Sequence, residues 1–296
     1  MAIKKRKLKL KSLLKSIGFY IALIVVTVFL VVLIRVFVFA VFTIPSNSMA
    51  PSILTGDKIL VNKLLFGGRI HDIFNSSIET QIRRVKGMRK IRHNDILVFN
   101  FPHKKSWNKI EMDFNQYYVK RCIALPGDVV KIKNGFYKIS GYSEPLGLIS
   151  SQKKLSQTSD ENLMQIEGIY NTFPYDPIHN WNIKSFGPLH IPKKGDSIHI
   201  NTENFTIYKK LIEDETKGEL SIKDHVVYLN SQKLDHYVFN TNYYFLVGDN
   251  GLDSQDSRYW GMLPEYCIVG VVTRIWSSID PHTSKYRTDR ILKKVR

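Results

Sequence analysis

The stretch Tyr117-Tyr-Val-Lys-Arg-Cys-Ile-Ala-Leu-Pro-Gly-Asp-Val-Val-Lys-Ile-Lys133 indicates the fold class of this chain. Two runs rich in aromatic and β-branched residues flank a Pro-Gly-Asp turn sequence, which is typical of two strands joined by a tight connection. Comparable runs recur at 58–62, 95–100, 117–124, 128–133, 196–200, 226–230, 243–247 and 267–276. This spacing predicts a mainly β protein with an antiparallel, barrel-like core sheet, and it argues against a βαβ array.

The amino terminus predicts a membrane anchor. Seven Lys or Arg lie within the first fifteen residues, and residues 17–34 carry no charge. At about 1.5 Å per helical residue, this run and the apolar residues up to 42 can cross a hydrocarbon core of roughly 30 Å. Arg35 can extend toward the headgroups. A cleaved secretory signal is the alternative, but its apolar region is usually only about 7 to 15 residues long.

The basic cluster before this apolar run predicts the topology. By the positive-inside rule, residues 1–16 form a cytoplasmic tail, and the chain after about residue 43 lies across the membrane. No later run is comparably apolar. We therefore expect a single-pass protein of the cytoplasmic (inner) membrane with a large periplasmic or cell-exterior part.

The formal net charge of +17 raises nucleic acid as a partner. However, the basic clusters at 83–92 and 285–296 are not accompanied by a nucleic-acid motif. An anionic bilayer surface is the simpler partner, because a basic residue near it gains roughly 1 kcal/mol. The expected partner is therefore the lipid bilayer, with no nucleic acid.

Two cysteines, Cys122 and Cys267, lie in apolar strand-like sequence. Buried thiols are the default for such positions, although an oxidising compartment permits one disulfide. Both alternatives remain open from the sequence.

Two regions depart from the β pattern. Residues 141–225 indicate an inserted β-rich domain, with a helix predicted near 206–218. Residues 67–92 indicate a smaller excursion, with a helix predicted at 78–85.

Lys120 is the strongest candidate for a general base. The nine His are scattered, without the spacing of a catalytic residue or a metal cluster. Alternation places Lys120 on the same strand face as Tyr118 and Cys122. If that face is apolar and no carboxylate is near, burial lowers the pKa of the amine from about 10.4 and frees it to accept a proton. A solvated or snorkelling lysine is the alternative reading.

Ser46 and Ser48 lie between Pro45 and Pro51, where serines by themselves usually mark a turn. Their combination with Lys120 and with the run Gly248-Asp-Asn-Gly-Leu-Asp-Ser-Gln-Asp-Ser-Arg-Tyr-Trp-Gly261, after an apolar anchor, favours a hydrolase.

These segments resemble the type I signal peptidases, the membrane-anchored Ser/Lys proteases of the bacterial leader peptidase family. Residues 44–57 resemble the nucleophile box, 94–99 a structural strand, 118–128 the box of the general base and 248–261 the final box. Three departures stand out. Asn47 replaces the commoner Gly between the serines, Asn94 stands where Gly is usual, and Gly251-Leu252 replaces an Arg-Asp pair.

The resemblance implies a role for each matched residue. Ser48 is expected to be the nucleophile and Lys120 the base, while Ser46 and the backbone N–H of Ser48 form the oxyanion hole. Ser254 would position the lysine amine, and Asp256 and Arg258 would brace the site, although their ion pair has a purely structural alternative. Shallow pockets for Ala-like side chains are expected to be lined by Ile44, Pro45, Met49, Ile53, Tyr118 and Val119. No metal or other cofactor is implied.

The expected function is therefore removal of signal peptides from exported preproteins through an acyl-enzyme. The alternatives are a related membrane Ser/Lys protease with other exported substrates and a non-enzymatic anchored β-domain. The expected organisation comprises a cytoplasmic tail (1–16), an anchor (17–42), a catalytic core in two parts (43–140 and 226–281), the inserted domain (141–225) and a basic C-terminal tail (282–296).

Overall fold

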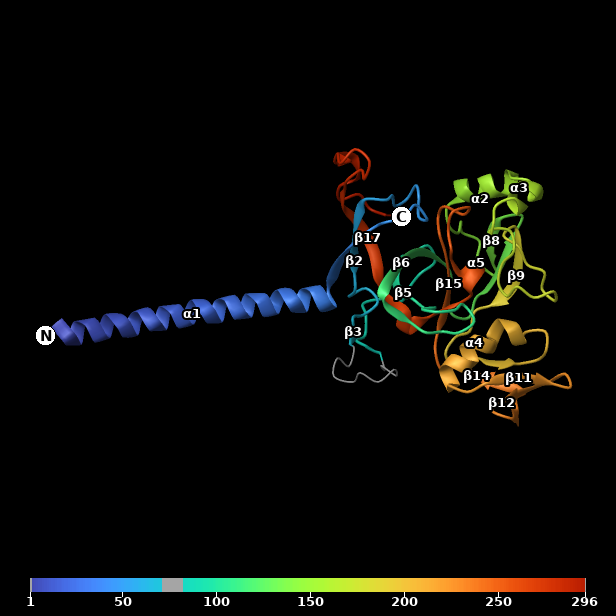
Figure 1. The fold of residues 1–296 in the computed structure, drawn as a ribbon, viewed down its shortest axis with the longest axis horizontal. Coiled ribbons are helices and arrows are strands. Elements are labelled where there is room, and N and C mark those ends of the chain that lie inside the picture. The colour runs from blue at the N-terminus through green and yellow to red at the C-terminus, as the bar shows by residue number, and fades with distance from the viewer. Residues whose placement is uncertain (1, 71–81, 296) are drawn as a thin grey trace.

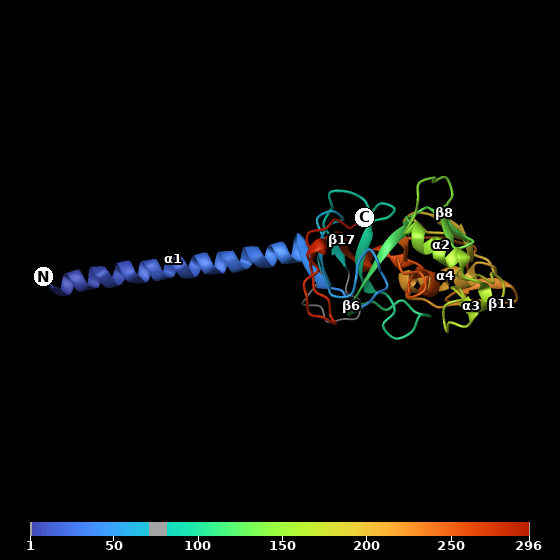
Figure 2. The same ribbon diagram turned by 90° about the horizontal axis from the view of Figure 1, so that it is seen from above.

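The computed structural model describes residues 2–70 and 82–295, and it is mainly β, which confirms the predicted fold class. One long helix, α1 (Ala2–Phe37), projects from one end of a body built of antiparallel sheets (Figure 1, Figure 2). The predicted core strands are present, with bounds that shift by a few residues.

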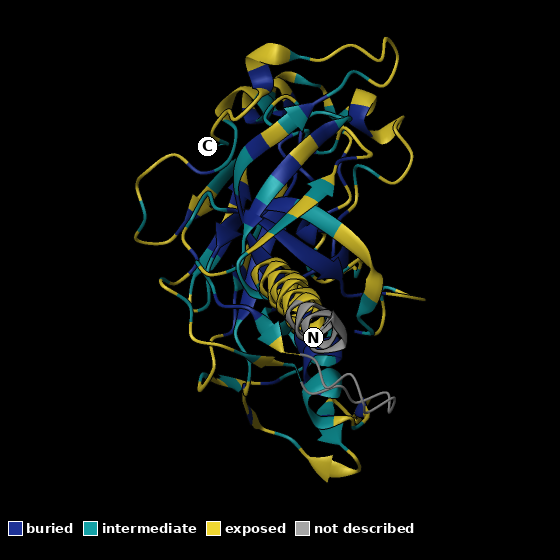
Figure 3. Cartoon of the chain, turned by 90° about the vertical axis from the view of Figure 1, so that its left-hand side faces the viewer, coloured by how far each residue is buried: buried dark blue, intermediate teal, exposed yellow. Residues whose placement is uncertain are grey.

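Helix α1 ends earlier than the predicted anchor. Its segment Leu13–Phe37 is long and apolar enough to cross a membrane. None of this window is buried against the β body, and most of the helix has the colour of exposed residues in Figure 3. Lys63 Nζ donates to the carbonyls of Arg35 and Val36, each at 3.0 Å, and so caps the last turn. Residues 39–42, predicted as anchor, instead belong to a strand, because their backbone groups pair with a neighbouring strand of the main sheet.

The largest sheet has seven strands in the order β1-β2-β17-β5-β6-β15-β16. Their bounds are β1 (Phe39–Thr43), β2 (Asp57–Asn62), β17 (Ile268–Ser278), β5 (Ile96–Phe101), β6 (Asp113–Ala124), β15 (Tyr243–Val247) and β16 (Leu263–Pro264). Strand β5 is buried on both faces: Leu97 packs in one apolar cluster and Val98 in another. The sheet therefore has a core on each side, consistent with a curved, barrel-like arrangement.

A second group of sheets lies farther from α1 (Figure 1). One of these sheets contains β7 (Val129–Lys133), β8 (Phe136–Ile139) and β9 (Ser185–His190), and another contains β11 (Leu220–Lys223), β12 (Val226–Leu229) and β13 (Gln232–Lys233). A third pairs β10 (Ser197–His199) with β14 (His236–Val238). The pair β3 (Arg69–Ile70) and β4 (Arg83–Arg84) lies instead at the end of the body next to α1, below β2 in Figure 1. Strand β9 pairs with β7, so the predicted boundary at 140/141 runs through a sheet. The division into domains stays a prediction.

The shorter helices are α2 (Ile149–Gln157), α3 (Asp160–Met164), α4 (Phe205–Thr216), α5 (Ser257–Trp260), and the 3₁₀ turns η1 (Glu265–Cys267) and η2 (Thr288–Arg290). Helix α4 confirms the helix predicted near 206–218. The first half of the helix predicted at 78–85 lies outside the described residues, and in the second half Arg83–Arg84 forms β4 instead.

The basic C-terminal segment is folded against the core. Ile275 N donates to Lys293 O at 2.9 Å, and Arg287 N donates to Ser278 O at 3.0 Å, so residues 287–294 run beside β17. A stretch predicted as a tail is thus part of the β body.

Candidate active site

Ser48 lies in the loop between β1 and β2. Backbone hydrogen bonds close the base of this loop, from Ile44 N to Asp57 O and from Gly56 N to Ile44 O, both 2.9 Å. A turn at its tip, from Ala50 N to Asn47 O at 2.9 Å, places Ser48 half-buried at the edge of the sheet. Asn47 is not among the described residues with positive φ, so this turn does not need the Gly that is commoner there.

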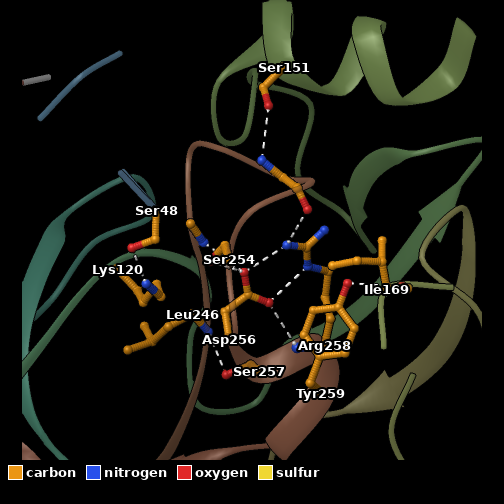
Figure 4. Close-up of polar contacts among 12 residues, drawn as sticks. Ser48, Lys120, Ser151, Ile169, Leu246, Ser254, Asp256, Ser257, Arg258 and Tyr259 are labelled. Atoms are coloured by element: carbon orange, nitrogen blue, oxygen red, sulfur yellow. Dashed lines mark hydrogen bonds and ion pairs between the residues drawn. The ribbon is translucent and has the colours of Figure 1, made fainter. Parts of the chain in front are cut away.

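Lys120 projects from β6 toward this turn. Its Nζ donates to Ser48 Oγ at 2.6 Å, and the residue is only 4% exposed (Figure 4). Burial lowers the pKa of Lys120 to about 8. The expectation that no carboxylate lies near Lys120 is wrong: Asp256 acts to raise the pKa of the amine, and burial outweighs this effect.

The loop 248–261 is organised around the carboxylate of Asp256. This wholly buried side chain accepts from Gly248 N at 2.9 Å and from Ser254 Oγ at 2.8 Å. It also pairs with Arg258 through Nε–Oδ1 at 2.8 Å and Nη2–Oδ2 at 2.7 Å. Arg258 Nη2 continues to Gly251 O at 3.0 Å, so the pair holds both ends of the loop (Figure 4).

The loop also touches the nucleophile turn directly. Asn250 N donates to Ser48 O at 3.0 Å, and Asn250 Nδ2 donates to Asn47 O at 3.2 Å. A side chain at Gly248 would overlap Ser254 Oγ and the Ser48 carbonyl, so this close approach requires glycine. Asparagine is common in turns, so the sequence alone gives no sign of this contact.

Ser254 lies beside the predicted dyad without bonding to the amine. Its hydroxyl donates to Asp256, and within the described chain no hydrogen bond joins it to Lys120 Nζ. Its predicted role in positioning the lysine stays a prediction.

A buried ion pair that the sequence reading missed lies behind the dyad. Arg121 bonds Asp249 through Nε–Oδ1 at 2.7 Å and Nη2–Oδ2 at 2.5 Å, and both side chains are nearly inaccessible. The sequence signal for this pair was an arginine next to Lys120 in an apolar strand. Successive strand residues lie on opposite faces, so Arg121 lies on the face opposite Lys120, and a buried charge there needs a partner.

The residues predicted to line substrate pockets fall into two clusters. Ile44, Met49 and Ile53 are buried together, and Val119 packs against them. Tyr118 packs on the opposite cluster, and its ring centroid lies 5.7 Å from Lys120 Nζ. Pro45 is exposed at the surface. Ile44, Met49, Ile53 and Val119 therefore surround the base of the nucleophile turn. Contact of these residues with substrate stays a prediction.

The two donors expected at the oxyanion hole, the Ser46 hydroxyl and the Ser48 N–H, have no acceptor among the described residues. Ser46 is exposed, and neither its hydroxyl nor the Ser48 N–H forms a hydrogen bond with any residue in the described ranges. Both groups are thus free to bind a substrate oxygen.

Among the described residues, no cysteine or histidine forms a hydrogen bond with Ser48 or Lys120. Cys122 and Cys267 are buried free thiols, so no disulfide joins them, and burial raises the pKa of each. His103 is buried, and desolvation lowers its pKa to about 4. In residues 2–70 and 82–295, no three His, Cys, Asp or Glu side chains gather as metal ligands would.

Comparison with known proteins places this chain in a family. A family model described as signal peptidase, peptidase S26, matches residues 17–178 and 187–277. A signal peptidase I of Buchnera aphidicola subsp. Acyrthosiphon pisum (strain APS) is 30% identical over 299 residues, which cover 94% of this chain and 78% of the relative.

More distant relatives carry the same description. A signal peptidase I of Helicobacter pylori (strain ATCC 700392 / 26695) is 26% identical, over 87% of this chain and 81% of the relative. A crystal structure of a signal peptidase I from Enterococcus faecalis V583 covers 62% of this chain and 97% of its own, with a TM-score of 0.31 and 20% identity.

Proposed function

The chain belongs to the signal peptidase family, peptidase S26, and from this we propose that Ser48 and Lys120 form the dyad with which it removes signal peptides from preproteins. The removal of signal peptides is the activity of the family and of this chain. The observation that carries the proposed dyad is the 2.6 Å contact of the buried Lys120 amine with Ser48 Oγ.

The proposed reaction proceeds through an acyl-enzyme. Ser48 Oγ attacks the scissile carbonyl while neutral Lys120 accepts its proton. The same amine then protonates the leaving amine of the mature protein, and water hydrolyses the ester. The Ser48 N–H and the Ser46 hydroxyl bind the oxyanion, and each such donor contributes about 3 kcal/mol in comparable sites.

Substrate selection is proposed to follow from the apolar surroundings of the turn. Ile44, Met49, Ile53 and Val119, which pack together in one apolar cluster, would line shallow pockets for Ala-like side chains, and Pro45 and Tyr118 complete the predicted set. An extended peptide would pair with backbone close to Pro45 by strand addition.

The proposed location is the cytoplasmic membrane. The part of α1 from residue 17 onward is the anchor, residues 1–16 lie in the cytoplasm, and the β body lies outside the cytoplasm, because the basic cluster precedes the apolar segment. The bilayer, and not nucleic acid, is the proposed partner of the basic surface.

The nucleophile is tested by Ser48→Ala, with Ser143→Ala as a matched control at an exposed serine. We expect Ser48→Ala to fold and insert normally and to lose precursor cleavage by roughly 10³-fold or more. The measurement is cleavage of an exported precursor by detergent-solubilised protein, with the cut mapped by mass spectrometry. Wild-type cleavage by folded Ser48→Ala would refute the dyad.

A further inference from the structure

The basic residues of the C-terminal segment divide into two sets. Lys285, Lys293 and Lys294 are exposed, as expected for a solvated basic stretch. Arg287 is half-buried and Arg290 is 7% exposed, and both turn toward the nucleophile loop. Because buried arginines need partners, this division indicates a specific role for the two arginines.

Arg290 is bound to both the side chain and the backbone of the nucleophile loop. Its Nε and Nη2 pair with Asp57 Oδ1 at 3.1 Å and Oδ2 at 2.6 Å. Its Nη2 also donates to Ser52 O at 3.1 Å. Asp57 is wholly buried, so the Arg290–Asp57 pair is a bidentate, charge-assisted contact that is shielded from solvent.

The residues that Arg290 holds determine the path of the loop. Asp57 closes the loop base through its carbonyl and accepts from Leu54 N at 2.8 Å through its carboxylate. Ser52 is held from two directions, with its carbonyl on Arg290 and its hydroxyl 3.4 Å from Arg121 Nη2. Ser52 is four residues beyond Ser48, within the same compact turn.

A second arginine reinforces this contact. Arg287 Nη1 donates to Thr55 O at 3.0 Å, and its Nη2 pairs with Asp280 at 2.8 Å. The half of the loop that follows Ser48 is therefore bonded to a segment more than 200 residues later in the sequence.

We propose that the C-terminal segment is part of the catalytic apparatus and that Arg290 is a positioning residue, which holds the loop so that Ser48 Oγ stays on Lys120 Nζ. The inference rests on the proposed role of Ser48 as nucleophile. Its physical basis is that a displacement of about 1 Å in a reacting group can lower the rate about 10²-fold. Arg290 lies behind the loop and reaches the reaction only through Asp57 and Ser52.

The test compares Arg290→Gln with Lys293→Gln, which removes an exposed charge from the same segment. Both are assayed as full-length protein, about 20 °C below the unfolding midpoint of each. We expect Arg290→Gln to lower kcat for precursor cleavage about 10- to 100-fold with KM within about twofold. Lys293→Gln should match the wild type. A purely structural role would lower the unfolding midpoint and leave kcat unchanged.

Two further variants keep the test decisive if Arg290→Gln does not fold. Arg290→Lys retains a cation beside Asp57 but cannot bridge both carboxylate oxygens and Ser52 O, so an intermediate kcat is expected. The pair Asp57→Asn with Arg290→Gln leaves no unpaired buried charge and should fold with a low kcat. Wild-type kcat in whichever of these variants folds would overturn the proposal.

The failure of this proposal is distinguishable from failure of the dyad. If Ser48→Ala is inactive and folded Arg290→Gln cleaves at the wild-type rate, only the positioning role is lost. If Ser48→Ala remains active, the dyad itself is wrong, whatever the Arg290 variants do.

Discussion

Lys120 shows how strongly a single residue depends on its surroundings. In water its amine would be almost fully protonated at neutral pH and unable to accept the Ser48 proton. Burial lowers its pKa to about 8, and Arg258 adds to that effect, while Asp256 opposes it. At pH 7 roughly a tenth of the molecules then hold the neutral amine, which is enough for it to act as the base.

The pH profile of cleavage should report this pKa. Because only neutral Lys120 accepts the proton, kcat/KM should rise tenfold per pH unit below about 8 and level off above it. Lys120→Met and Lys120→Arg should both fold and fail to cleave, since neither offers a proton acceptor. The measurements are initial cleavage rates from pH 6 to 10, with circular dichroism as the folding control. Substantial activity in folded Lys120→Arg would assign the base to another group.

The loop 248–261 is the element on which the site depends most. Short polar loops are usually mobile, but this one is buried and bonded internally through Asp256. The Asp256–Arg258 pair lies at 0% exposure for both side chains, so each charge needs the other.

Asp256→Asn should therefore destabilise the protein. Removing one partner of a buried pair leaves the Arg258 charge uncompensated, and the free energy of unfolding should fall by about 3–5 kcal/mol. Asp253→Asn, an exposed carboxylate in the same loop, is the matched control and should change it by less than about 0.5 kcal/mol. Urea unfolding of both variants gives the comparison. Equal stability of the two variants would contradict the structural importance of the pair.

The same variant separates two roles of this pair. If the kcat of Asp256→Asn is unchanged under conditions in which the variant is folded, the Asp256–Arg258 pair contributes only to stability. This is the structural alternative that the sequence left open. A fall in kcat would support a role in bracing the site.

At the scale of the whole molecule, the seven-stranded sheet lies next to α1, while the sheets and helices of residues 129–240 lie at the far end (Figure 1, Figure 2). Strand β1 follows α1 almost directly, and Lys63, the residue after β2, caps the helix. If α1 spans the bilayer, this connection keeps the seven-stranded sheet at the end of the body that is nearer to the membrane.

The proposed orientation predicts the outcome of limited proteolysis. Protease added outside spheroplasts should digest the β body, beyond about residue 43, and spare an epitope placed before residue 16. Immunoblots with tags at each end provide the measurement, and lysed spheroplasts the control. Survival of the β body until lysis would mean that the orientation is reversed.

Local sequence determined much of the fold and of the candidate site. The core strands at 58–62, 117–124 and 243–247 are found within a few residues of the prediction, because apolar β-branched runs bounded by Gly-Asp turns are a local signal. The catalytic candidates are carried by short motifs, so Ser48 and Lys120 could be named without knowing that they meet.

Tertiary structure alone decided the features that depend on distant partners. Residues 39–42 are as apolar as a membrane segment, and only their pairing with β2 makes them a strand. The partners of Asp249 and Asp57 lie 128 and 233 residues away, at Arg121 and Arg290, so no spacing in the sequence could reveal them. A buried charge is stable only beside an opposite charge, because desolvation of an unpaired charge is costly. Which opposite charge lies beside it is decided by the folded chain.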